Sequence, residues 1–148
     1  MTQIDFYLNA ASKLQVTCKI AEKAVRQRMK VLILVPDDIV ARALDKLLWT
    51  SPATGFLPHC MTTDSLARET PVLIGRNNDP QPHDELLINL GNTPPPLFSR
   101  FQRLIELVSI DDEADKLAAR QRFRFYKDRG YKLSHHDLAH PGKGSSND

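Results

Sequence analysis

The feature that most constrains the fold is the segment of residues 30–35, which reads KVLILV and is apolar at nearly every position. A strand with one face in solvent alternates apolar and polar residues, whereas a strand buried on both faces is apolar throughout. Strands of the second kind belong to parallel sheets that carry helices on both faces. We therefore predict an α/β fold, a three-layer α/β/α domain with a mostly parallel central sheet.

Other segments of strand length alternate with segments of helical periodicity, which supports this fold class. Further strands are predicted at residues 5–8, 72–75, 85–90 and 103–109. Helices are predicted at residues 12–30, from Asp37 or Asp38 to about Trp49, at about 95–102 and at 112–129. The first of them begins with Ser12 and has Gln15 three residues later, which is the spacing of a capping box.

The length of 148 residues suits a single domain, which we place at residues 1–138. The last residues, AHPGKGSSND, predict a disordered tail at 139–148. The N-terminus lacks the pattern of a signal peptide, and no apolar run approaches the roughly 18 residues of a membrane span. We therefore expect a cytoplasmic protein without a membrane partner, whose Cys18 and Cys60 stay reduced.

The sequence contains no motif that is typical of catalysis or of cofactor binding. The loop after the first strand, residues 9–12, reads NAAS and lacks the glycines of a phosphate-binding loop, so the domain is Rossmann-like only in shape. His59 and Cys60 have no second ligand pair nearby, and the remaining histidines are predicted in turns or at the surface. We predict no catalytic residue, metal, cofactor or small-molecule substrate.

The last predicted helix places a basic and aromatic face on one side. Residues spaced by three, four or seven positions project from the same side of a helix. Here these residues are Lys116, Arg120, Phe123, Arg124 and Lys127. Ala114, Leu117, Ala118 and Phe125 lie elsewhere and can face the core. A solvated basic face is the simpler interpretation, but an exposed Phe123 among cations favours a binding site.

Two kinds of partner fit this face, a nucleic acid and an acidic peptide. The formal net charge of +2 and the pI of 8.6 are low for a dedicated nucleic-acid binder, for which a pI above about 9 is usual. Exposed ion pairs contribute only about 0.2–1 kcal/mol each. Either partner therefore needs an apolar anchor in addition to charge.

A second aromatic feature is the pair Trp49 and Phe56, which flanks a short loop rich in small residues. One interpretation is a core plug that closes one end of the sheet. The other is an anchor for a protein partner, since large aromatic residues are frequent in interface hot spots.

Together these segments resemble the chi subunit family of bacterial DNA polymerase III holoenzyme, over residues 4–132. The resemblance rests on DFYL, KVLILVPDD, ALDKLLWTSPATGFLPH and KLAARQRFRFYKDRGYKL, in this order along the chain. It implies a non-catalytic accessory subunit of the replicative polymerase, with no nucleotide bound. The tail at 139–148 extends beyond the resemblance.

The resemblance also implies partners and assigns residues to them. Chi forms a one-to-one complex with the psi subunit, which tethers it to the clamp loader, and Trp49 and Phe56 match the psi-contacting pair. Chi also grips the acidic C-terminal tail of single-stranded-DNA-binding protein, which ends in phenylalanine. The tail-binding set carries over to Lys116, Arg120, Phe123, Arg124 and Lys127, with DNA contacted mainly indirectly. The family often has tyrosine at Phe123, lysine at Arg124 and arginine at Lys127. The alternative function is a small module whose basic helix binds single-stranded nucleic acid directly.

Overall fold

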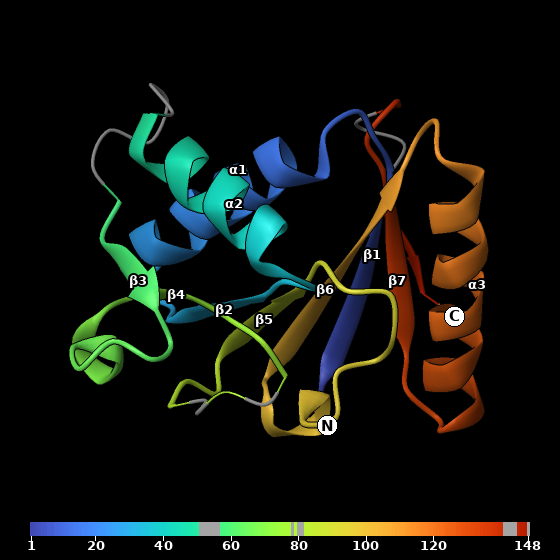
Figure 1. Cartoon of the computed structure of the whole chain (residues 1–148). Helices are drawn as coiled ribbons and strands as arrows, with labels where there is room; N and C mark the ends of the chain where they lie inside the picture. Colours follow the sequence, from blue (N-terminus) through green and yellow to red (C-terminus); the bar gives the residue numbers. More distant parts are fainter. Residues whose placement is uncertain (51–56, 78, 80–81, 141–144, 148) are drawn as a thin grey trace.

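A computed structural model describes the chain except residues 51–56, 78, 80–81, 141–144 and 148. Its strands form one sheet in the order β3-β4-β2-β5-β6-β1-β7-β8 (Figure 1). Their bounds are β1 Gln3–Ala10, β2 Val31–Leu34, β3 His59–Met61, β4 Val72–Gly75, β5 Leu86–Asn89, β6 Arg103–Ser109, β7 Leu133–Asp137 and β8 Ser145–Asn147. All neighbouring strands are parallel except β7 and β8.

Helices cover both faces of this sheet, as the apolar strand predicts. The helices α1 (Lys13–Arg26) and α2 (Asp38–Thr50) pack on one face, and α3 (Glu113–Asp128) packs on the other (Figure 1). Alternate side chains of β2 are buried on opposite faces of the sheet. Val31 and Ile33 join the core beneath α1 and α2, whereas Leu32 and Leu34 join the core beneath α3. The predicted three-layer α/β/α architecture is therefore confirmed.

The helices begin at the residues that the capping signals indicate. The Ser12 hydroxyl accepts a hydrogen bond from the Gln15 backbone N–H at 3.2 Å. The Asp112 carboxylate accepts one from the Asp115 N–H at 3.1 Å. At the other end of α3, Gly130 has a φ of 85° and follows the last turn, where a left-handed residue usually ends a helix.

The sequence-based predictions are wrong mainly in short elements and near the edges of the sheet. The predicted helix at 95–102 is only a 3-10 turn, η2 (Phe98–Arg100). A second 3-10 turn, η1 (Ala67–Glu69), occurs earlier in the chain. The strands β3 and β7 were not predicted. β3 has three residues, and β7 reads LSHHD with mostly half-buried positions, so neither shows an apolar strand pattern.

Part of the tail that the sequence predicts as disordered is a strand. β8 pairs with β7 in antiparallel register, which satisfies backbone groups that β7 would otherwise expose as an edge strand. This differs from the predicted disorder for residues 145–147, whereas residues 141–144 and 148 lie outside the described residues.

His83 also differs from its prediction as a surface or turn histidine. The residue is buried, and its Nε2 lies 2.7 Å from the Thr70 carbonyl oxygen. Burial lowers the pKa of His83, because the protonated ring would lose its hydration. Within the described part of the chain, no group of histidine, cysteine, aspartate and glutamate side chains could hold a metal ion. None of the described helices is long and apolar enough to cross a membrane.

Candidate functional site

The five residues predicted on the last helix line a single groove. Its volume is about 720 Å³, and it lies between α3 and the strands β1, β6 and β7. The lining residues are Phe6, Leu8, Asn9, Val108, Lys116, Ala119, Arg120, Phe123, Arg124, Lys127, Asp128 and His135. The structure therefore brings the predicted set together and adds a strand-borne wall that the helix pattern could not reveal.

The apolar part of the groove is built from packed aromatic rings. Phe123 is half-buried, and its ring packs edge-to-face with that of Phe6 of β1, with centroids 5.4 Å apart. The Lys127 ammonium lies 5.8 Å from the centroid of the Phe123 ring. The expectation of an exposed Phe123 is met only in part, because β1 supplies a neighbouring ring. Phe123 is a half-buried ring that lines the groove.

The polar part of the groove is strongly cationic. Arg120, Arg124 and Lys127 are exposed, and no described carboxylate lies within 4.0 Å of their charged groups. Lys116 is paired only with the exposed Glu113 of its own helix, at 3.2 Å. Such exposed pairs are weak, so all of these cations remain available to an anionic ligand.

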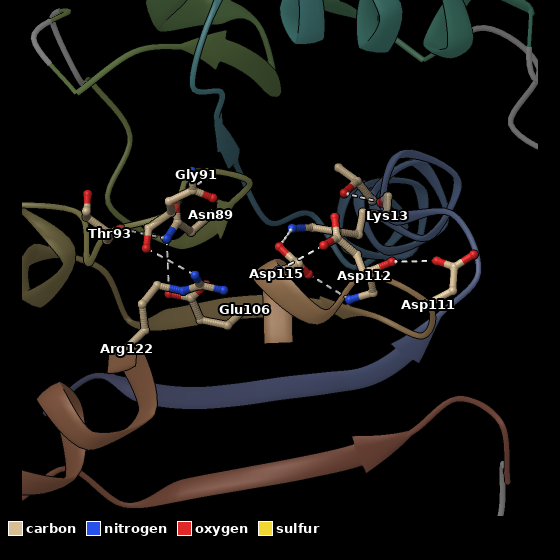
Figure 2. Close-up of polar contacts among 12 residues, drawn as sticks. Lys13, Asn89, Gly91, Thr93, Glu106, Asp111, Asp112, Asp115 and Arg122 are labelled. Carbon is tan, nitrogen blue, oxygen red and sulfur yellow. Dashed lines mark hydrogen bonds and ion pairs between the residues drawn. The ribbon is translucent and has the colours of Figure 1, made fainter. Parts of the chain in front are cut away.

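A buried charged network between α3 and the strands β5 and β6 fixes the position of α3. Glu106 of β6 and Arg122 of α3 are both fully buried, and Arg122 Nε donates to Glu106 Oε1 at 2.9 Å (Figure 2). The other carboxylate oxygen accepts hydrogen bonds from the Tyr126 hydroxyl at 2.6 Å and from Asn89 Nδ2 at 3.0 Å. Burial raises the pKa of Glu106, while Arg122 and these hydrogen bonds act in the opposite direction.

This network corrects the predicted core face of the last helix. The predicted core residue Phe125 does pack against the core, and it is half-buried. Ala119, Arg122 and Tyr126 point into the core, whereas the predicted core residue Leu117 is 55% exposed. One signal in the sequence could have revealed this. Glu106 lies inside the apolar strand RLIELVS, and a buried carboxylate requires a partner from a neighbouring element. Arg122 and Tyr126 are four residues apart and supply that partner from one side of the helix.

The first turn of α3 is held by a second set of polar contacts. Asp115 accepts hydrogen bonds from Lys13 Nζ of α1 and from the Ser109 backbone N–H, both at 2.8 Å (Figure 2). Burial alone would raise the pKa of Asp115, but these hydrogen bonds and the Lys13 charge outweigh it and lower the pKa. The first turn of α3 is thus held by α1 and by the end of β6, and Arg122 holds the second half of α3 to β6.

Trp49 lies at the end of α2, on the opposite side of the sheet from the groove (Figure 1). Its side chain is 57% exposed, so the interpretation as a core plug is wrong for this residue. The indole ring packs edge-on against His59 at 4.9 Å, and His59 Nε2 lies 3.0 Å from an Asp45 carboxylate oxygen. The other member of the predicted pair, Phe56, lies outside the described residues.

Comparison with known proteins identifies similar chains. The family model described as "DNA polymerase III chi subunit, HolC" matches residues 1–134. A Pseudomonas aeruginosa protein named DNA polymerase III subunit chi is 39% identical over 142 residues, covering 93% of this chain and 98% of that protein. Proteins of the same name from Haemophilus influenzae and Escherichia coli are 31% and 29% identical, each covering 81% of this chain and 83% and 82% of the respective relative.

Proposed function

Because the chain belongs to the DNA polymerase III chi subunit family, we propose that it bridges the clamp loader to single-stranded-DNA-binding protein during replication. In this role it binds the psi subunit through Trp49 and Phe56, and the acidic tail of single-stranded-DNA-binding protein through α3. It is a non-catalytic adaptor, and its residues 1–138 act as one cytoplasmic domain. Its contact with DNA is mainly indirect.

The observation that carries this proposal is the combination of cations available to a ligand and an apolar floor in one groove. From Lys116 to Lys127 the helix rises about 16 Å, at roughly 1.5 Å per residue. A peptide of about five extended residues, at about 3.3 Å each, fits that length. Its carboxylates would lie along the cations, and a terminal phenylalanine ring would rest against Phe123 and Phe6.

The same geometry favours a peptide over a nucleic acid at this groove. Base stacking needs an aromatic face presented to solvent. The Phe123 ring is half-buried, packs edge-to-face with Phe6 and has the Lys127 ammonium nearby. Direct binding of single-stranded nucleic acid through α3 is the alternative function. Titration of an α3 variant with an oligonucleotide tests it.

Substitution of Arg120 by alanine should weaken binding of the acidic peptide by about 1.4- to 5-fold. One exposed ion pair contributes about 0.2–1 kcal/mol, and about 1.4 kcal/mol corresponds to tenfold in affinity. The measurement is a fluorescence titration with a labelled acidic peptide ending in Pro-Phe. Arg68, which is exposed outside the groove, provides the matched control Arg68→Ala with unchanged affinity. An unchanged dissociation constant for folded Arg120→Ala would contradict the site.

Substitution of Trp49 by alanine should weaken psi binding by about tenfold or more, as truncation of an aromatic hot-spot residue does. Binding of the acidic peptide should stay at the wild-type value, because Trp49 and the groove lie on opposite faces of the sheet. The matched control is Leu117→Ala on α3, since Leu117 is 55% exposed and lies outside the groove lining. Loss of both interactions together would mean that Trp49 supports the fold and not the interface.

A further inference from the structure

We propose that the C-terminal half of α1 and the turn after it bind the phosphodiester backbone of a nucleic acid. This surface, the α1 basic surface, consists of Lys19, Lys23, Arg26, Arg28 and Lys30. It is separate from the peptide groove, because α1 and α3 lie on opposite faces of the sheet (Figure 1). The inference therefore does not depend on the function proposed for α3.

The arrangement of these side chains follows from helical spacing. Lys19, Lys23 and Arg26 are four and three residues apart and form a single exposed stripe on α1. The opposite side of the helix is buried through Cys18, Ala21 and Ala24. The helix ends at Arg26, and Arg28 and Lys30 continue the run of exposed cations toward β2.

Little negative charge offsets these cations. Arg26 pairs with Glu22 at 3.2 Å, with an exposed guanidinium. The Glu85 carboxylate near Lys30 accepts a hydrogen bond from the backbone N–H of that residue at 2.9 Å. Among the residues that the structure describes, no carboxylate forms an ion pair with Lys19, Lys23, Arg28 or Lys30.

Arg28 carries an independent sign of function in its backbone. It has a φ of 63°, in the left-handed region where glycine is favoured. The Met29 N–H donates to the Ala24 carbonyl at 2.9 Å, just as the Tyr131 N–H donates to the Tyr126 carbonyl at 3.2 Å after α3. The equivalent position after α3 is Gly130, with a φ of 85°.

The same helix ending thus contains glycine in one place and arginine in the other. A side chain in this conformation is strained relative to glycine, because its Cβ approaches the neighbouring backbone. An arginine in this strained position is explained if its guanidinium contacts a ligand. Sites of function are where such backbone strain tends to occur.

The chemistry of the surface defines the ligand class. No phenylalanine, tyrosine or tryptophan occurs between residues 13 and 30, so the α1 basic surface itself offers bases no ring on which to stack. Cations without rings contact phosphates and read no sequence. Four phosphate contacts on a single strand predict a salt slope of about −3, and affinity should fall about 50-fold between 50 and 200 mM salt.

The test is fluorescence anisotropy of a labelled oligothymidylate of about 20 nucleotides, titrated with the full chain across this salt range. The test variant combines Lys19→Gln, Lys23→Gln, Arg28→Gln and Lys30→Gln. The control combines Lys116→Gln, Arg120→Gln, Arg124→Gln and Lys127→Gln, which removes the same charge from the other face. Circular dichroism and thermal unfolding establish that both variants are folded.

The α1 variant should bind the oligonucleotide at least tenfold more weakly, with the salt slope reduced by about 3, and still bind the acidic peptide. The α3 control should retain the slope and lose the peptide. Equal losses in both variants would mean that net charge alone is responsible, and a loss confined to the control would place nucleic-acid binding on α3. Either result overturns the inference, as does wild-type binding that is independent of salt. Peptide binding reports separately on the function proposed for the groove.

Discussion

Substitution of Arg122 by alanine should lower the free energy of unfolding by about 3–5 kcal/mol. The guanidinium is 1% exposed and donates both to Glu106 and, through Nη1, to the Asn92 carbonyl at 3.1 Å. Its removal leaves the Glu106 carboxylate buried without a compensating cation. Breaking one partner of a buried ion pair is costly for this reason, even where the intact pair itself contributes little. Urea unfolding followed by circular dichroism measures the change.

Arg124, two residues further along α3, provides the control for the Arg122 prediction. Arg124 carries the same guanidinium on the same helix but is exposed, so Arg124→Ala should change the free energy of unfolding by no more than about 0.5 kcal/mol. A loss below about 1 kcal/mol for Arg122→Ala would show that Glu106 does not need its partner. The double variant Glu106→Gln, Arg122→Met should recover part of the loss, because it removes both charges.

The central fold could be predicted from the sequence because its strands are buried on both faces. The strands β4 and β6 begin and end at the predicted residues, and β2 differs by one residue at each end. Strands near the edges are different, since their side chains meet solvent, a helix end or a turn. β3 and β7 therefore lack the apolar pattern, and their existence depends on pairing with β4 and β1.

The groove could be predicted only in part. Spacing along the helix placed Lys116, Arg120, Phe123, Arg124 and Lys127 on one side, and the structure brings them together. Spacing alone does not tell which side meets the sheet. Arg122 and Tyr126 look like part of a polar, aromatic surface until Glu106 is known to lie beneath them. The strand-borne wall, including Phe6 and His135, required the order of the strands.

Arg122 and the groove residues are linked by the geometry of one helix. Arg120 and Arg124 lie two residues before and after Arg122, so they project away from the side that is buried. The ion pair to Glu106 thus sets the rotation of α3 about its axis. That rotation points the exposed guanidiniums into the groove and places Phe123 against Phe6.

Substitution of Phe123 by alanine should weaken binding of the acidic peptide by about 10- to 100-fold. This effect is far larger than that of losing any one cation. Burial of a large apolar side chain contributes about 1.5–3 kcal/mol, whereas an exposed ion pair contributes about 0.2–1 kcal/mol. The ring is the apolar surface against which a terminal phenylalanine would pack. Titration with the labelled peptide measures the loss, and Phe123→Tyr, which keeps the ring, should remain close to wild type.

The matched control for Phe123 is Phe125→Ala on the same helix. Phe125 is also half-buried, but it does not line the groove. Its ring centroid lies 6.2 Å from that of Phe98, and the Arg129 guanidinium carbon lies 3.5 Å from the Phe125 centroid. Both variants lose an aromatic ring and should be destabilised to a similar extent, which thermal unfolding records. Only Phe123→Ala should lose affinity for the peptide. If both variants bind the peptide equally well, the aromatic floor plays no part in recognition. This result would contradict the proposed binding mode, because exposed ion pairs alone are too weak to hold the peptide.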